Sequence, residues 1–239
     1  MSESKEISIK AAEYQKAYIE KREAAQIKYG ATPEGAGWRI PASMDYRAEK
    51  LANVLRHGDL KEFVGTGRVL NIVDVGGAFG GVAKGMLDFL EKQGVKAHYT
   101  SVDFMQSAVD AGTAAYKNTK YEDKVSFICG NYLDIPTLGD LYVCSGVFTD
   151  STTFTPKEFK AIIEANLSKM YSEARLAVKF NLANMSVDYF ERANMYMSPF
   201  DALALATKYS SKVVIDHSVE YQLFEMFVTI YKDEIKYSL

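Results

Sequence analysis

The sequence predicts an α/β fold: a doubly wound, mostly parallel sheet of seven strands with an antiparallel C-terminal hairpin strand, preceded by an N-terminal helical cap. From residue 68 onward, short apolar runs alternate with segments of helical periodicity, a pattern typical of right-handed crossovers between parallel strands. The last two apolar runs, 213–216 and 225–231, are separated by only about eight residues. Because a helical crossover needs a longer connection, these two strands should be antiparallel.

The N-terminal elements should form the cap. Residues 11–29 are rich in helix formers and predict a first helix, and the glycine and proline residues of 30–37 predict a loop after it. Ser43 is placed to cap a second helix, which should end near His57 with Gly58 as its left-handed terminal residue.

The core should begin where the apolar periodicity changes, so we divide the chain into a helical cap over 1–60 and an α/β core over 61–239. The predicted strands of the core cover 69–74, 98–103, 125–129, 141–144, 174–180, 213–216 and 225–231. The predicted helices between them cover 82–93, 108–117, 156–171 and 199–209.

The composition of the chain limits the kinds of partner that it is expected to bind. The chain has 239 residues, of which 48% are hydrophobic, and its net charge is −3, so no whole-chain attraction to a nucleic acid backbone is expected. No signal peptide and no apolar run of the ~20 residues that span a membrane is visible, which favours a cytoplasmic protein without a membrane partner. Cys129 and Cys144 lie in apolar runs and should be small buried residues rather than metal ligands.

A glycine cluster lies at the first strand-to-helix turn. It reads Asp74-Val-Gly76-Gly77-Ala78-Phe-Gly80-Gly. Glycines are needed there because the turn is tight and because a ligand must approach the backbone without a Cβ atom intervening. Glycine also makes turns that bind nothing, so the cluster alone leaves a purely structural role open.

Two carboxylates favour a particular ligand. Asp103 ends the second predicted strand, where a carboxylate can accept both hydroxyl groups of a ribose. Asp74 precedes the first glycine by two residues, where it would repel the pyrophosphate of a dinucleotide. S-adenosylmethionine carries no phosphate and has an ammonium group that an acid can help to hold. These residues therefore favour S-adenosylmethionine as the cofactor.

Two other classes of function stay open at this point. An NAD(P)-binding Rossmann oxidoreductase would require a dinucleotide fingerprint, but Ala78 stands at its middle glycine and no catalytic Tyr-x-x-x-Lys follows the fourth or fifth predicted strand. A noncatalytic cofactor-binding protein of the same fold is the second alternative. No Asn-Pro-Pro-aromatic tetrad follows the fourth strand, which counts against amino-methylation of DNA bases.

The run Asp74-x-Gly76-x-Ala78-x-Gly80 resembles the first motif of class I (Rossmann-like) S-adenosylmethionine-dependent methyltransferases, with alanine where many members have the middle glycine. The resemblance covers roughly residues 65–239 and includes the antiparallel last strand. It implies that the chain is a methyltransferase. Segments around Trp38, Ser145 and Asp216 are further similar to a little-characterised bacterial and viral group, whose motifs imply no particular acceptor.

The resemblance also implies roles for residues that follow each strand. Asp103 matches the ribose-binding acid, Phe104 and Met105 the pair that flanks the adenine, and Asn131, beside Tyr132, a residue that meets the adenine amino group. Ser145 and Phe148 follow the fourth strand, where the family lines the cofactor pocket beside the transferred methyl group.

Four further features are candidates for the site. Trp38 could be a lid residue over the sulfonium or only a loop anchor, and Arg47 could pair with the cofactor carboxylate or only be a solvated helix residue. His217 follows the sixth strand and is a candidate general base, with a structural role as the alternative. The insertion over 182–198 is the predicted wall for the acceptor, which we expect to be a small molecule methylated on oxygen or nitrogen.

Overall fold

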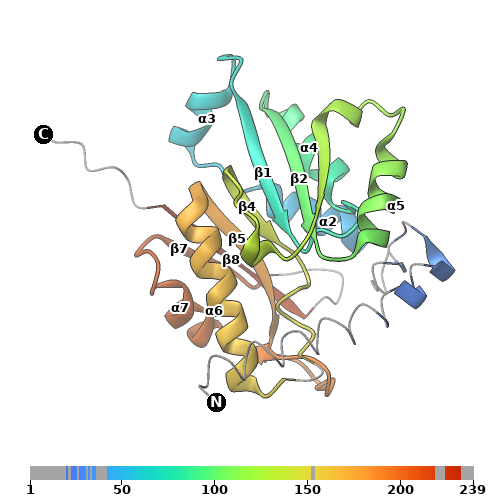
Figure 1. Ribbon diagram of the computed structural model, residues 1–239. Coiled ribbons are helices and arrows are strands. Elements are labelled where there is room, and N and C mark those ends of the chain that lie inside the picture. Colours follow the sequence, from blue (N-terminus) through green and yellow to red (C-terminus); the bar gives the residue numbers. More distant parts are fainter. Residues whose placement is uncertain are drawn as a thin grey trace, which may run out of the picture.

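The computed structural model describes residues 42–151, 154–218 and 224–232, together with 20, 23–25, 27–30, 32 and 34–35. Within these residues the chain forms one sheet with helices on both faces (Figure 1). The strands are β1 (Val69–Val75), β2 (Lys96–Asp103), β3 (Val125–Cys129), β4 (Gly139–Cys144), β5 (Ala174–Asn184), β6 (Tyr196–Met197), β7 (Val213–Asp216) and β8 (Glu225–Tyr231). The α-helices are α2 (Ser43–Ala52), α3 (His57–Phe63), α4 (Ala83–Lys92), α5 (Gln106–Tyr116), α6 (Pro156–Glu173) and α7 (Pro199–Ala206).

The strand order is β3-β2-β1-β4-β5-β8-β7, and the two-residue β6 pairs with the end of β5. Every pairing is parallel except those of β8, which is antiparallel to both β5 and β7. The predicted mixed sheet and its antiparallel C-terminal strand are confirmed. The parallel strands all end at one edge of the sheet, the lower edge in Figure 1, and we call this the carboxyl edge.

Two apolar cores lie on the two faces of the sheet because successive side chains of a strand alternate between faces. On β4, Tyr142 contributes to a core with α6 and α7, whereas Val143 contributes to a second core with α2, α3 and α4. The long α6 begins with a capping box: the Thr155 hydroxyl accepts from the backbone N–H of Glu158, whose carboxylate accepts from the backbone N–H of Thr155. None of the described helices is long and apolar enough to cross a membrane.

The cap differs from its prediction. The second helix ends at Ala52 rather than near His57, because Asn53 leaves the helical conformation with a ψ of 74° although Leu55 continues the apolar periodicity. His57 instead begins the unpredicted α3, in whose first turn Asp59 accepts from the backbone N–H of Arg56. Ser43 is the first helical residue, not the cap, and Gly58 has no left-handed φ.

Other predicted elements differ in smaller ways. In the predicted first helix, residues 20, 23–25 and 27–29 are helical, and the remainder of 11–29 lies outside the described residues. Cys144 is buried as predicted, but Cys129 is exposed because β3 is the edge strand of the sheet. The strand β6 was not predicted, because two residues in an irregular insertion carry no periodicity.

Candidate functional site

The glycine turn joins the end of β1 to α4 at the carboxyl edge. Gly76 and Gly80 both have a φ of 73°, and Ala78 has a φ of 47°, a conformation that a non-glycine residue seldom adopts. A Cβ atom on Gly76 would lie 2.4 Å from the Cγ2 atom of Val147, and one on Gly77 would lie 2.6 Å from the Ser101 hydroxyl. Close packing against Val147 and Ser101 therefore requires these two glycines.

Asp103 closes this turn from the neighbouring strand. Its Oδ2 atom accepts from the backbone N–H of Ala78 at 3.0 Å, and its Oδ1 atom accepts from that of Met105 at 2.9 Å. The carboxyl group is buried, and burial raises its pKa above the ordinary value while the backbone hydrogen bonds lower it. Each carboxylate oxygen can accept a second hydrogen bond, so the group can still bind two hydroxyl groups.

Asp74 is the acid of the glycine turn, and it is buried at the end of β1. Its Oδ2 atom accepts the phenolic hydrogen of Tyr99, a fully buried residue of β2. Its Oδ1 atom is buried and has no hydrogen-bond partner among the described residues. Burial raises the pKa of this carboxyl group to about 7, although the hydrogen bond from Tyr99 acts in the opposite direction. A cationic donor beside Oδ1 would satisfy both the geometry and the charge.

The turn after β4 lies against the glycine turn, since Val147 fills the space that a side chain on Gly76 would need. Gly146, with a φ of 81°, donates its N–H to the side-chain oxygen of Asn181 at 2.7 Å. The hydroxyl oxygens of Ser145 and Thr149 are buried and, within the described part of the chain, have no partner.

These two hydroxyl groups belong to residues on either side of Phe148, which is buried against Phe180 with the two ring centroids 5.6 Å apart. Phe148 therefore belongs to the apolar core beneath the turn. The turn itself follows β4 at the carboxyl edge and carries the two buried hydroxyl groups.

The end of β3 contributes one of its two predicted residues. The backbone N–H of Gly130 donates to the carbonyl of Asp103 at 2.9 Å, which keeps the following Asn131 near the end of β2. Asn131 is exposed and caps the short 3-10 turn that follows it, accepting from the backbone N–H of Leu133. Tyr132, in contrast, is buried and donates its hydroxyl to Glu173 at 3.0 Å, at the opposite end of the sheet, where β5 begins. The structure does not bring the Tyr132 hydroxyl to the carboxyl edge.

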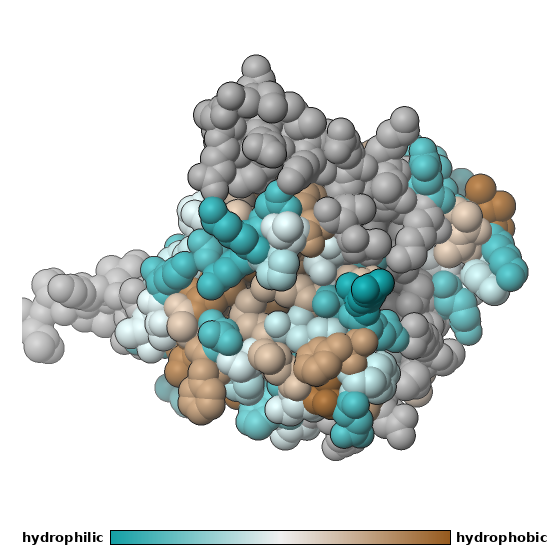
Figure 2. Space-filling view, turned by 90° about the horizontal axis from the view of Figure 1, so that it is seen from below, coloured by the Kyte–Doolittle hydropathy of each residue, from teal (hydrophilic) through white to brown (hydrophobic). Residues whose placement is uncertain are grey.

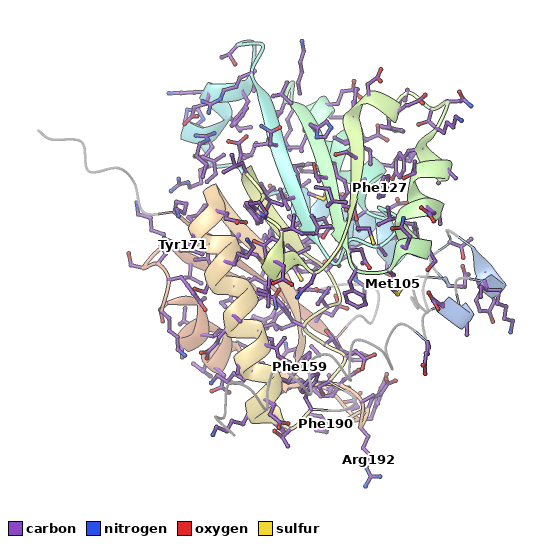
Figure 3. The ribbon with its side chains drawn as sticks, viewed as in Figure 1. Met105, Phe127, Phe159, Tyr171, Phe190 and Arg192 are labelled. Atoms are coloured by element: carbon purple, nitrogen blue, oxygen red, sulfur yellow. The ribbon has the colours of Figure 1, made fainter. Side chains whose placement is uncertain are left out.

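Phe104 and Met105 connect β2 to α5. Met105 is buried and lies at the start of α5, as Figure 3 shows, while Phe104 is half-buried. The exposed Cys129 points its sulfur toward the carbonyl oxygen of Phe104 at 3.8 Å. These residues form the side of the carboxyl edge that lies next to Asp103.

Arg47 takes part in a buried polar network. Its Nε atom donates to the Oε2 atom of Glu225 at 3.2 Å, and Nη2 donates to Oε1 of the same carboxylate at 2.5 Å. The Nδ2 atom of Asn181 also donates to Oε2, at 2.8 Å. The network thus joins the cap, through α2, to the start of β8 and to the turn after β4 that Asn181 holds.

Asn181, Glu225 and Tyr99 were not identified from the sequence. Asn181 interrupts the apolar run of β5, and this is a sequence signal for a polar role. Its hydrogen-bond partners, however, are distant from it in the sequence. Tyr99 carried no signal, because a tyrosine in a strand is usually a core residue.

Of the remaining predicted residues, His217 lies away from the carboxyl edge and Trp38 lies outside the described residues. His217 follows β7 and is exposed. β5 and β8 separate its strand from β4, which at about 4.8 Å per strand amounts to roughly 14 Å.

The atoms at the carboxyl edge fit S-adenosylmethionine better than a dinucleotide. The three buried side-chain atoms without a partner among the described residues, on Asp74, Ser145 and Thr149, lie near the end of β1 and in the turn after β4. Meanwhile the start of α4 is occupied by the Tyr116 hydroxyl, which donates to the carbonyl of Gly80 at 2.7 Å and accepts from the N–H of Lys84 at 3.3 Å. The carboxyl group of Asp74 and the side chain of Tyr116 therefore make the start of α4 a poor binding site for a pyrophosphate. No group of metal-ligating side chains is found among the described residues.

No family model matches the chain. A Mycobacterium tuberculosis (strain ATCC 25618 / H37Rv) protein named "Putative methyltransferase Rv1506c" is 28% identical over 165 residues, which are 68% of this chain and 93% of that protein. Among solved structures, the magnesium protoporphyrin IX methyltransferase ChlM of Synechocystis PCC 6803 with bound SAH has a TM-score of 0.59 at 11% identity, over 81% of this chain and 85% of that one. The N-methyltransferase NodS of Bradyrhizobium japonicum WM9 has a TM-score of 0.52 at 13% identity, over 81% of this chain and 96% of that one.

Proposed function

We propose that this chain, a class I S-adenosylmethionine-dependent methyltransferase, transfers the methyl group to an oxygen or nitrogen atom of a small molecule. The observation that carries the proposal is the set of three buried oxygen atoms, on Asp74, Ser145 and Thr149, that have no hydrogen-bond partner among the described residues. They lie near the end of β1 and in the turn after β4. Leaving a buried polar atom unpaired costs about 1–3 kcal/mol, so such a set favours a polar ligand at this edge.

We assign the cofactor to the ends of β1, β2 and β4. In this proposal the Oδ1 atom of Asp74 holds the ammonium group, Asp103 accepts the two ribose hydroxyl groups, and the backbone from Gly76 to Gly80 lies along the ligand. Both carboxylates are buried and fixed by hydrogen bonds, so neither needs to reorganise when the cofactor binds.

The remaining predicted residues are assigned with the same proposal. Phe104 and Met105 flank the adenine, and Asn131 meets its amino group. The Ser145 hydroxyl and the packing of Phe148 shape the pocket beside the methyl group. Arg47 can pair with the cofactor carboxylate only in competition with Glu225, which it contacts through two nitrogen atoms.

The cofactor supplies a methyl group on positively charged sulfur, so that a lone pair of the acceptor atom forms a new bond to the methyl carbon while the carbon–sulfur pair remains on sulfur. The residues of this chain then have to align the acceptor and exclude water. A base is needed where the acceptor atom still carries its proton at neutral pH. His217 stays our candidate for that role, and it could act only on an acceptor that extends from β4 toward β7.

Three considerations support a small acceptor. The net charge of −3 gives no attraction to a phosphate backbone. The name of the structurally similar ChlM specifies a small molecule as its acceptor. The insertion between β5 and α7 is tied to the turn after β4, because Met195 donates its N–H to the carbonyl of Thr149 at 2.8 Å. It therefore lies beside the proposed methyl position, as a wall for the acceptor would.

Transfer of label tests the proposal. The protein is incubated with methyl-labelled S-adenosylmethionine and, separately, with the small-molecule, protein and nucleic acid fractions of a cell extract. We expect label in the small-molecule fraction, and less of it with Asp103→Ala. Label only in protein or nucleic acid would overturn the assignment of the acceptor class.

A further inference from the structure

An aromatic surface lies at the carboxyl edge, on the insertion and on the residue that precedes β8. It consists of Met185, Tyr189, Phe190 and Tyr196 of the insertion and of Phe224. Tyr189 is 52% exposed and Phe190 is 61% exposed, so the insertion presents aromatic rings to solvent rather than to the core. Figure 2, seen from below, shows apolar residues among polar ones on this side of the molecule. Several exposed apolar side chains on one segment often mark a binding site.

The rings of this surface are paired with one another. Tyr189 and Phe224 meet edge to face with centroids 5.9 Å apart, and Phe190 and Tyr196 do so at 4.8 Å. The hydroxyl of Tyr196 also accepts from the backbone N–H of Glu191 at 3.0 Å. Aromatic rings pair favourably with one another in edge-to-face or offset-stacked arrangements, so these side chains suit an aromatic partner.

Backbone hydrogen bonds hold the aromatic surface next to the proposed methyl position. Ser151 donates to the carbonyl of Ala193 at 2.7 Å, and Asn184 donates to the carbonyl of Phe224 at 2.8 Å. Together with the bond between Met195 and Thr149, these contacts fasten both ends of the insertion to the ends of β4, β5 and β8. Phe190 and Arg192 accordingly lie below the sheet in Figure 3, on the segment that projects beyond the carboxyl edge.

Thr149 supplies a polar group between the proposed methyl position and the aromatic surface. Its backbone carbonyl binds the insertion, while its buried hydroxyl has no partner among the described residues. The proposed cofactor contacts account for Asp74 and Ser145 but not for Thr149. A ligand that lies along the aromatic surface and carries a hydroxyl or amino group at its end could satisfy the Thr149 hydroxyl.

We infer that the acceptor is a planar aromatic molecule bearing a hydroxyl or amino group, with its ring on the aromatic surface and its heteroatom next to Thr149. This inference rests on the proposed function and specifies its substrate class. The heteroatom forms the bond to the methyl carbon and then loses its proton to solvent or to a base, and the sulfur keeps the electron pair of the broken bond.

A matched pair of probes tests the inference. Binding of 1-naphthol and of its saturated counterpart decahydro-1-naphthol is measured by equilibrium dialysis in the presence of S-adenosylhomocysteine, whose own binding is measured in the same samples. We expect saturable binding of 1-naphthol that is at least tenfold tighter than that of the saturated alcohol. The double variant Tyr189→Ala, Phe190→Ala should weaken 1-naphthol binding about tenfold or more and leave S-adenosylhomocysteine binding unchanged.

Phe200 provides the control, because it is 84% exposed but lies on α7, outside the aromatic surface. Phe200→Ala should leave both ligands unaffected. Equal binding of the two alcohols, no binding of 1-naphthol, or no effect of the double variant would overturn the aromatic acceptor while S-adenosylhomocysteine still bound. Loss of S-adenosylhomocysteine binding by the wild-type protein would overturn this inference together with the proposed function.

Discussion

Tyr99 donates its phenolic hydrogen to one oxygen of Asp74, and the other oxygen of that carboxylate is buried without a partner among the described residues. The two residues lie on adjacent parallel strands, where Asp74 pairs with Ser101, two positions beyond Tyr99. The hydrogen bond fixes the plane of the carboxylate and leaves its second oxygen for a ligand. This relationship supports the assignment of Asp74 to the ammonium group of the cofactor.

The first prediction concerns Tyr99. Tyr99→Phe removes the hydrogen bond that lowers the pKa of Asp74, so that pKa should rise above about 7. Because the ammonium group needs the ionised carboxylate, S-adenosylmethionine affinity should increase as pH rises through about 7 in the wild type, and through a higher pH in the variant. At pH 7 the variant should bind about tenfold more weakly, equivalent to about 1.4 kcal/mol. Calorimetric titrations from pH 6 to about 8.5 would measure both effects.

Tyr142→Phe is the control for this experiment, since Tyr142 is also a fully buried tyrosine but contacts Thr137 and Glu173 at the other end of the sheet. It should leave the cofactor affinity and its pH dependence unchanged. The same pH profile in the wild type and in Tyr99→Phe would contradict the role given to Tyr99.

The second prediction concerns stability without cofactor. The pKa of Asp74 is raised by burial from 3.8 to about 7, so the unfolded chain ionises this group more readily than the folded one. Stability should therefore fall as pH rises from about 4 to about 7, by an amount on the order of a few kcal/mol. Asp74→Asn should be more stable than the wild type at pH 8 by several °C in Tm, with the gain disappearing near pH 4. A gain in Tm that is the same at pH 4 and pH 8 would count against the buried charge as its cause.

The third prediction separates backbone strain from packing in the glycine turn. Gly76 and Gly146 have φ values of 73° and 81°, but only at Gly76 would a Cβ atom meet another residue, Val147. Gly146→Ala should cost only the left-handed penalty of about 1–2 kcal/mol, and Gly76→Ala should cost more. Combining Gly76→Ala with Val147→Ala should recover part of the difference. Urea denaturation of the four proteins checks this, and equal losses for the two glycine variants would show that Val147 plays no part.

The fourth prediction concerns Lys179, which is buried in β5 and donates to the carbonyl of Asn53 at 2.9 Å. Burial lowers its pKa from 10.5 to about 8, so holding the charged amine inside the fold destabilises the protein as pH falls from about 10 through 8. Lys179→Met should raise the stability at pH 7 by about 1–3 kcal/mol, with a smaller gain at pH 10. Asn53 is exposed, so water can replace the lost hydrogen bond.

Lys92→Met is the control for Lys179→Met, because Lys92 is exposed at the end of α4. Its effect on Tm should be small and should not depend on pH. If Lys179→Met proves less stable than the wild type at pH 7, the hydrogen bond to Asn53 outweighs the buried charge.

The elements of the fold were predictable because the signals for them are local. The alternation of apolar runs and helical segments predicted β1 to β5, and the short connection between β7 and β8 predicted their antiparallel pairing. The end of α2 was missed because the apolar periodicity continues to Leu55 while the backbone at Asn53 does not stay helical. A periodicity records which side chains are apolar, not where a hydrogen-bonded turn stops.

The candidate site was predictable to a lesser extent. Asp74 and Asp103 stand next to glycines and strand ends, so their spacing along the chain carries information. The contact of Arg47 with Glu225 spans 178 residues, and nothing near either residue in the sequence indicates it. Likewise, the orientation of Tyr132 toward Glu173 depends on the face of the sheet that α6 covers, which sequence spacing alone leaves open.

Calorimetric titration of the protein with S-adenosylmethionine, with NAD as the competing cofactor, tests the central claim most directly. The account predicts saturable one-to-one binding of S-adenosylmethionine, no binding of NAD, and a loss of affinity of about 1–3 kcal/mol in Asp103→Asn, which keeps the shape of the side chain but not its charge. A folded wild-type protein that binds NAD, or that binds neither S-adenosylmethionine nor S-adenosylhomocysteine, would contradict it.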